Sequence, residues 1–161
     1  MATNMFIRIG DIKGESHDSR HKDEIEIVSW AWGIANPVMG SSGTGTSTGR
    51  ATFQDITFTH LVDRASPRLM LASASAQRFR DARLTVRRPG TTTPEEFLLI
   101  NLENVVVTGT QLSATEPVGG LVEHVTLAFV RVDYEYRRQL PDGSPDTGVH
   151  FKWDLQHNGP F

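Results

Sequence analysis

Histidines are the residues of this sequence best suited to metal binding or proton transfer, and the chain has six of them. His17 and His21 are four residues apart, a spacing that would place two metal ligands on one face of a helix. Their segment is polar and loop-like, however, and it lacks the glutamate of a zinc-protease helix. We therefore predict that both histidines are solvent-exposed and that the chain holds no metal.

Three further histidines, His60, His124 and His150, fall in strand-like segments, where the sequence identifies no partner for them. A hydrolase that uses His60 or His124 with a nearby aspartate is one open hypothesis. The chain contains no cysteine and no Gly-x-Ser-x-Gly motif, so the usual thiol and serine nucleophiles are missing. We predict no catalytic residue and no enzymatic activity.

A glycine-rich run resembles a phosphate-binding loop only superficially. Gly43, Gly45 and Gly49 form a glycine-rich run like that of a phosphate-binding loop, but a P-loop ends in Gly-Lys-Ser or Gly-Lys-Thr. Here Gly49 is followed by Arg50 and Ala51, and a strand pattern comes next. The sequence therefore predicts neither a nucleotide nor another cofactor.

The charged residues are expected to form the rim of a contact with a neighbouring molecule, and they do not indicate a binding site for a polyanion. The net charge is −3, which is small and of the wrong sign for a nucleic-acid-binding protein. With 19 acidic residues, clusters of carboxylates are expected anywhere on the surface. We expect them to form a charged rim that faces basic residues of a neighbouring molecule, such as Arg83, Arg87 and Arg88.

Length and hydropathy bound the architecture. A chain of 161 residues is typical of one domain (1–161), and 38% hydrophobic with 22% charged residues is an ordinary globular balance. No apolar run approaches the roughly 20 residues that span a membrane, so we expect no membrane insertion. The first residues lack the basic start and apolar stretch of a secretory signal. We expect that the general export route does not carry this protein.

The dominant hydrophobic period is two, which indicates β-strands. The candidate strands are 5–12, 24–33, 51–61, 82–87, 97–108, 122–138 and 149–155. In 122–138 the apolar face changes near Phe129 and Val130, which predicts a bend or bulge. The pattern predicts a mainly β barrel or sandwich.

The segment 24–33 carries apolar side chains on both faces, so we expect it to be covered on both sides over part of its length. If it is one regular strand, its residues divide between two faces by alternation. The first face then holds Ile25, Ile27, Ser29 and Ala31, and the second holds Glu26, Val28, Trp30 and Trp32. The tryptophans are expected in the core or in a subunit contact.

One helix is predicted between the strands, over about 66–79. Ser66 would supply a capping hydroxyl, and Pro67 suits the first turn. An apolar stripe could lie on a sheet and is formed by Leu69, Ala72, Ala76 and Phe79.

A long loop is predicted at about 36–49, because this segment is small, uncharged and rich in glycine, serine and threonine. Loops of this length within one domain are usually functional or disordered. Two interpretations stay open: the tip of a hairpin, or an arm that becomes ordered against a neighbouring subunit.

Several blocks of the sequence together resemble the Hcp (haemolysin-coregulated protein) family of the bacterial type VI secretion system. They are 6–16 (FIRIGDIKGES), 21–33 (HKDEIEIVSWAWG), 53–59 (FQDITFT) and 62–70 (VDRASPRLM), followed by 125–136 and 153–155. The blocks occur in the family's order and cover nearly the whole chain.

The resemblance implies a compact β-barrel of two sheets with one short flanking helix, and homohexameric rings that stack into a hollow tube. A contractile sheath would propel the tube out of the bacterial cytoplasm, with a spike protein at its tip and effector proteins carried in the lumen. The extended loop would mediate ring stacking, through Val38, Met39, Gly40, Gly43, Gly45 and Gly49.

For the lumen, the resemblance suggests the second strand, near Ser29 and Ala31. Family members can carry serine between the two tryptophans, whereas this chain has Ala31, which cannot hydrogen-bond to cargo.

A small-ligand β-barrel is the remaining alternative. It needs an interior lined by small or polar side chains. Phe53, Phe129, Phe151 and Trp153 argue instead that large side chains fill the interior.

Overall fold

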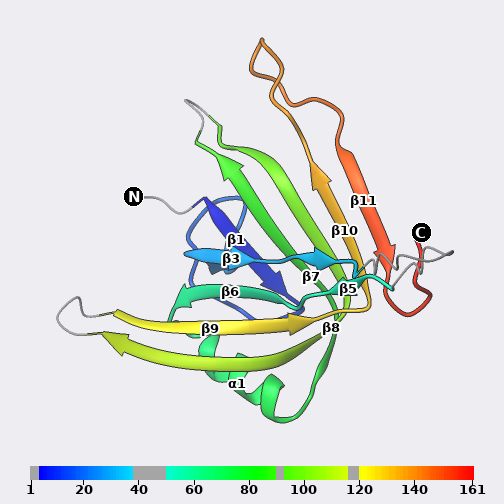
Figure 1. Cartoon of the computed structure of the whole chain (residues 1–161). Coiled ribbons are helices and arrows are strands. Elements are labelled where there is room, and N and C mark those ends of the chain that lie inside the picture. The colour runs from blue at the N-terminus through cyan, green and yellow to red at the C-terminus, as the bar shows by residue number, and fades with distance from the viewer. Residues whose placement is uncertain (1–3, 38–49, 90–92, 116–119) are drawn as a thin grey trace, which may run out of the picture.

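A computed structural model describes residues 4–37, 50–89, 93–115 and 120–161. The fold is mainly β with one short helix, as the sequence predicts (Figure 1). The elements are β1 (Met5–Ile9), β2 (Ile25–Glu26), β3 (Ser29–Ala31), β4 (Ile34–Ala35), β5 (Thr52–Phe53), β6 (Ile56–Leu61), α1 (Ser66–Ala74), β7 (Arg78–Arg88), β8 (Glu95–Thr115), β9 (Gly120–Ala128), β10 (Arg131–Tyr136) and β11 (Val149–Asp154).

Nine of the strands form one strongly bent sheet in the order β2-β1-β7-β8-β9-β6-β3, with β10 and β11 branching from β8. β8 is the longest strand, and it pairs with β7 and β10 over its first part and with β9 over its last part. Along one side of β8 the partner changes from β10 to β9, and along the other side the pairing with β7 stops at Val106; a register shift between Val107 and Gly109 follows directly. The two parts of the sheet therefore face each other across a core, and the small β4–β5 sheet covers one end (Figure 1).

The barrel is not closed by a continuous hydrogen-bonded ladder. Instead, the stretch 25–31 bridges its two edges, because β2 pairs with β1 while β3 pairs with β6. Where the partner changes, the Val28 N–H donates to the Thr59 carbonyl at 2.7 Å, although Thr59 is already the register partner of Ser29. Two residues thus face one across the ladder, which is a β-bulge.

The bulge corrects the prediction that 24–33 is one regular strand. Ile25 and Ile27 are buried, but Ser29 and Ala31 are exposed and do not share their face. Trp30 and Trp32, expected on the opposite face from Ile27, pack against the same core. The extra residue at the bulge shifts the side-chain alternation by one, which moves every later side chain to the other face.

The core between the two parts of the sheet consists of large aliphatic and aromatic side chains. Ile7, Ile9 and Phe58 are each 0% exposed, and α1 contributes Leu69 and Ala72. A filled interior contradicts the small-ligand barrel, because the space that a ligand would need is occupied.

A second cluster of aromatic rings lies between β4–β5 and the β10–β11 hairpin. Phe53 stacks on Trp153 with ring centroids 5.9 Å apart, and Trp32 lies edge-on to Phe129 at 6.1 Å.

The predicted change of face near Phe129 and Val130 is confirmed, because β9 ends at Ala128 and β10 begins at Arg131.

The helix begins at Ser66 as predicted, but Ser66 is its first residue and Ala65 occupies the capping position. Asp63 Oδ1 accepts a hydrogen bond from the Ala65 N–H, and Ser66 Oγ accepts one from the Asp63 N–H. The serine therefore stabilises the turn that precedes the helix, and the aspartate satisfies the first free N–H group.

The helix ends at Ala74, five residues earlier than predicted. The Gln77 N–H bonds to the Ala72 carbonyl and the Ala76 N–H to the Ser73 carbonyl, with Ala76 in the left-handed region at φ 51°. These two bonds form a Schellman motif, which stops the helix. Because the left-handed position holds alanine instead of the usual glycine, no residue type marks the end of the helix. Phe79 therefore belongs to β7 and not to the helix.

Gly14 allows the loop between β1 and β2 to fold back on itself. Its N–H donates to the Asp23 carbonyl at 2.7 Å, and a Cβ at this position would lie 2.4 Å from the Glu24 carbonyl oxygen. A backbone atom cannot move away as the end of a side chain can, so only glycine fits.

We expect Gly14→Ala to lower the free energy of unfolding by about 1–3 kcal/mol, because overpacking displaces the backbone. Gly109→Ala is the matched control, since its Cβ would lie 4.0 Å from the Thr126 side chain. The control should leave stability nearly unchanged. Urea unfolding of both variants measures the difference, and equal stabilities would contradict the proposed crowding.

Candidate assembly surface

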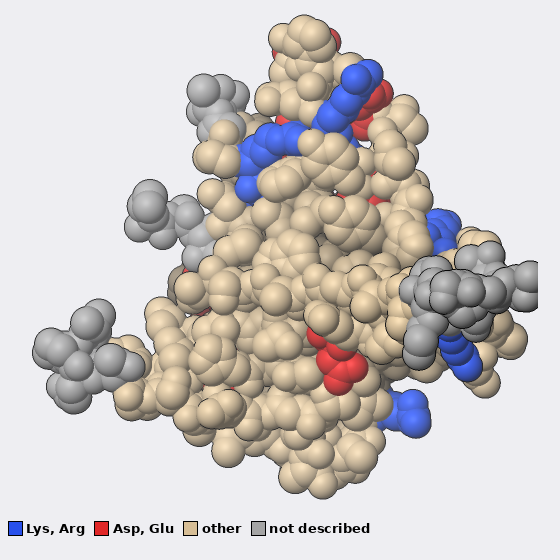
Figure 2. All heavy atoms as spheres, viewed as in Figure 1, with Lys and Arg blue, Asp and Glu red and all other residues tan. Residues whose placement is uncertain are grey.

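The outward face of β3, β6, β9 and the last part of β8 carries no charged side chain. Register pairing places these outward residues side by side across the four strands. They are Ser29, Ala31, Thr57, Thr59, Gly109, Gln111, Ser113, Val122, His124 and Thr126. Figure 2 shows this face as a broad surface almost without charge, with charged groups mostly at its periphery.

Ser29 and Ala31 lie on this face and are exposed, next to Thr59 and Thr57 respectively. The face is also polar, since Thr59 Oγ1 and His124 Nδ1 are 2.8 Å apart. A shallow hollow on it is lined by Thr57, Gly109, Thr110, Gln111, His124 and Thr126.

Sequence reasoning missed the contributions of β6, β8 and β9 to this face. The signal was present, since Thr57 and Thr59 alternate with the buried Ile56 and Phe58. What the sequence could not supply was the strand order that sets these residues beside Ser29 and Ala31.

This four-strand region has two open edges within the described part of the chain. One edge is β3, the last strand in the sheet order. The other is β8 beyond Val106, where its pairing with β7 stops. The N–H groups of Gly109 and Gln111 point toward β9. Because the direction of the N–H groups alternates along a strand, those of Thr110 and Leu112 point to the open edge.

The predicted stacking residues Val38, Met39, Gly40, Gly43, Gly45 and Gly49 all lie outside the described residues. Asn36 and Pro37, at the start of the predicted loop, are exposed and belong to neither strand nor helix.

Below the uncharged face, His60 and Glu123 form a fully buried polar pair between β6 and β9. Their side chains are both 0% exposed, with His60 Nε2 3.0 Å from Glu123 Oε1. Asp63 Oδ1 lies 3.8 Å from His60 Nδ1, and burial raises the pKa of the Asp63 carboxyl above its ordinary value. Because His60 has no solvent-accessible surface, it cannot meet a substrate in this structure, which argues against a hydrolase that uses it.

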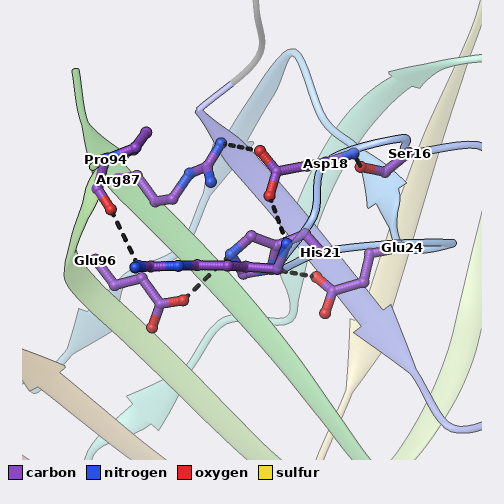
Figure 3. Close-up of polar contacts among 8 residues, drawn as sticks. Ser16, Asp18, His21, Glu24, Arg87, Pro94 and Glu96 are labelled. Atoms are coloured by element: carbon purple, nitrogen blue, oxygen red, sulfur yellow. Dashed lines mark hydrogen bonds and ion pairs between the residues drawn. The ribbon is translucent and has the colours of Figure 1, made fainter. Parts of the chain in front are cut away.

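His21 is buried, contrary to the prediction of a solvent-exposed side chain, whereas His17 is exposed as predicted. The His21 ring stacks on Phe6 with centroids 4.4 Å apart. Figure 3 shows its two nitrogens facing carboxylates from different elements: Nδ1 is 2.9 Å from Glu24, and Nε2 is 3.2 Å from Glu96 of β8. His21 therefore anchors the loop between β1 and β2 to the sheet.

Arg87 belongs to the same cluster and is only 5% exposed, so it does not face a neighbouring molecule as predicted. Its guanidinium lies over the Phe6 ring at 4.7 Å. It donates to Asp18 Oδ2 at 2.8 Å (Figure 3). This hydrogen bond holds the pKa of the Asp18 carboxyl below its ordinary value. Arg88 also binds within the chain, to the Arg137 carbonyl at 3.1 Å.

Two other exposed histidines, His124 and His150, pair with side chains of neighbouring strands, whereas His157 pairs with Asp154 within one turn. His150 Nδ1 lies 2.8 Å from Asp133 Oδ1 across the β10–β11 ladder. Within the described ranges, no group of three or more histidine and acidic side chains is arranged to hold a metal ion. In the same ranges, no helix has the length and apolar character needed to cross a membrane.

An uncharged outer face between two open strand edges is the arrangement expected of a structural protein that assembles through its sheet edges. Comparison with known sequences specifies the family. Residues 6–136 match the family model described as "Type VI secretion system effector, Hcp". The chain is 37% identical to protein hcp1 of Pseudomonas aeruginosa, over 98% of each chain.

Solved structures agree with the sequence match. A structure described as a type six secretion system protein superposes with a TM-score of 0.90 at 29% identity, over 98% of this chain and 99% of that chain. Hcp1 from Salmonella typhimurium gives a TM-score of 0.77 at 28% identity, over 100% of both chains. The chain belongs to the Hcp family, the tube proteins of the type VI secretion system.

Removing one partner of the buried pair should destabilise the fold strongly. We expect Glu123→Ala to lower the free energy of unfolding by about 3–5 kcal/mol, because it leaves His60 buried without its partner. His150→Ala is the control, since its pair with Asp133 is exposed and such pairs contribute about 0–1 kcal/mol. Urea unfolding of both variants tests this, and similar losses would show that burial of the pair is unimportant.

The Asp18–Arg87 contact should make stability depend on acid pH. The ionised carboxylate stabilises the fold above the ordinary pKa of 3.8, and this stabilisation is lost as the pH falls through the lower pKa of the folded state. Asp18→Asn should therefore lose stability at neutral pH, and its difference from the native protein should shrink below about pH 4.

Urea unfolding at several pH values between neutral and about 2.5 measures this change. Asp11→Asn is the control, because the Asp11 side chain is 77% exposed. If the difference in free energy of unfolding between Asp18→Asn and the native protein stayed constant with pH, the Asp18–Arg87 contact would not be a source of the pH dependence.

Proposed function

We propose that this chain forms a homohexameric ring and that its rings stack into a hollow secreted tube. The observation that carries the proposal is the position of the two open edges, at β3 and at the last part of β8, on either side of the uncharged face. An exposed strand edge presents unpaired backbone groups that a second chain can pair with. Because the two edges differ, the contact is heterologous and closes into a ring if the rotation permits.

In such a ring the uncharged face lines the channel, with Ser29 and Ala31 directed into it. Hydroxyl and amide side chains form hydrogen bonds without imposing one sign of charge, which suits a channel that passes effector proteins of different composition. Ala31 cannot hydrogen-bond, so cargo contacts fall to neighbouring hydroxyls such as Thr57 and Thr59. The role is that of carrier and structural subunit rather than enzyme.

The further partners follow from this role. We propose that a contractile sheath surrounds the tube, that a spike protein sits at its tip, and that the subunit passes from the bacterial cytoplasm to the outside through the type VI apparatus. The loop that includes Val38–Gly49 is proposed to mediate contact between rings, since its small uncharged residues suit a contact that forms and breaks.

Blocking one edge should abolish the ring without unfolding the subunit. Leu112→Pro removes a backbone N–H that points to the open edge of β8 and leaves the ladder to β9 intact. We expect its mass by light scattering to fall from about six times 17.9 kDa to that of one chain, with an unchanged circular dichroism spectrum.

Leu112→Ala is the matched control, because it removes the same side chain but keeps the N–H, and it should still form rings. Electron microscopy of the native protein should show the rings directly, with Ser29 and Ala31 facing the channel. A native protein that stays a single chain at micromolar concentration would disprove the proposed function, and a ring formed by Leu112→Pro would disprove the role of this edge.

A further inference from the structure

An apolar pocket with acidic walls lies at one end of the uncharged face, where β3 and β9 begin and β6 ends. Its volume is about 310 Å³, and it is lined by Glu15, Glu26, Ile27, Val28, Leu61, Val62 and Asp63. Val28 and Leu61 are each 58% exposed, which is unusual for large aliphatic side chains at neighbouring positions. Leu121, 56% exposed, extends the apolar surface, because its carbonyl accepts a hydrogen bond from the Val62 N–H.

The walls of this pocket carry three carboxyl groups. Glu26 is exposed, and Glu15 accepts a hydrogen bond from the Arg64 N–H at 3.1 Å. The nearest guanidinium, that of Arg64, is already held by Asp23 at 2.9 Å and by the Gly14 carbonyl at 2.6 Å. The pocket therefore combines aliphatic surface with negative charge, which suits an arginine or lysine side chain that lays its methylene stem on Val28 and Leu61.

The opposite end of the same strands carries a matching group. Arg50 is exposed where the chain enters β5, and it donates to the Leu155 carbonyl at 3.1 Å. Its neighbours in a smaller hollow are Ala51, Thr52, Phe53, Trp153, Leu155 and Asn158, none of which is acidic. Within the described ranges Arg50 has no carboxylate partner.

We propose that the acidic apolar pocket of one copy receives the Arg50 end of a second copy in the next ring of the tube. The pocket lies where β6 ends, and Arg50 precedes β5, next to the end of the face where β6 begins. Figure 1 shows these two ends of the strands on opposite sides of the molecule. A contact between opposite ends of two copies is heterologous, and when copies stack along the strand direction it repeats as a filament.

This inference rests on the proposed ring and adds two properties to the contact between rings. The pocket and the Arg50 end take part in that contact beside the loop proposed above, and the strength of the contact depends on charge. Because such charges are near the surface, added salt weakens the contact between rings. The edge pairing that closes each ring relies on backbone hydrogen bonds and is affected less.

Cysteine cross-linking tests the contact directly, since the native chain has no cysteine. In the variant Val28→Cys/Ala51→Cys, a short bis-maleimide should link copies into a ladder of multimers at high protein concentration. The two positions lie at opposite ends of one chain, so a link within a copy is excluded. The control pair is Ala51→Cys with Glu103→Cys, which places one thiol on the middle of β8 and should give no ladder.

Charge reversal in the cross-linking variant tests the role of Arg50. Arg50→Glu or Glu26→Arg alone should reduce the yield of the ladder about two- to fivefold, which corresponds to loss of one exposed ion pair. The two reversals together should restore the yield. Light scattering on each variant confirms that the ring itself is retained.

Three results are decisive. A ladder that is lost by each reversal and restored by both supports the inference. Intact rings without a ladder, or a ladder unaffected by Arg50→Glu, overturn it and leave the proposed ring standing. Variants and native protein that are all single chains overturn the proposed function instead.

Discussion

One constraint determines the architecture: the stretch 25–31 must pair first with β1 and then with β6. Its first residues pair with β1 and its last with β6, and the bulge at Val28 and Ser29 makes the change of partner possible. The inserted residue moves Trp30 and Trp32 into the core and turns Ser29 and Ala31 outward. Without it, alternation would bury the small residues and expose the tryptophans.

The placement of charge follows from that arrangement. Ion pairs and buried polar groups hold the parts of one subunit together: Arg87 with Asp18, His21 with two glutamates, and His60 with Glu123. The outward face of four strands is left uncharged, and its edges keep unpaired backbone groups. A subunit whose charged groups are largely satisfied internally can associate through backbone and apolar surface, where no charge has to be desolvated.

Much of the fold was predictable because it depends on local periodicity. Alternating apolar residues located most strands, and the change of face near Phe129 predicted the break between β9 and β10. The errors have one local cause and one tertiary cause. Ala76 takes a left-handed position that glycine normally marks, so the end of the helix was misplaced. His21 stands in a polar segment, and only its contact with Phe6 and Glu96 makes it a buried residue.

The sequence by itself determined the family and the mainly β class, since ordered motifs and composition are properties of the chain alone. The exposure of Ser29 and Ala31 depends on the bulge, which forms where the stretch 25–31 changes its partner strand. The tertiary structure decided which residues accompany those two: Thr57 and Thr59 from β6, His124 from β9 and Gln111 from β8. It also decided which charges are internal and which edges stay open. These properties depend on strand order and register, which join residues far apart in the chain and leave no periodic signal along it.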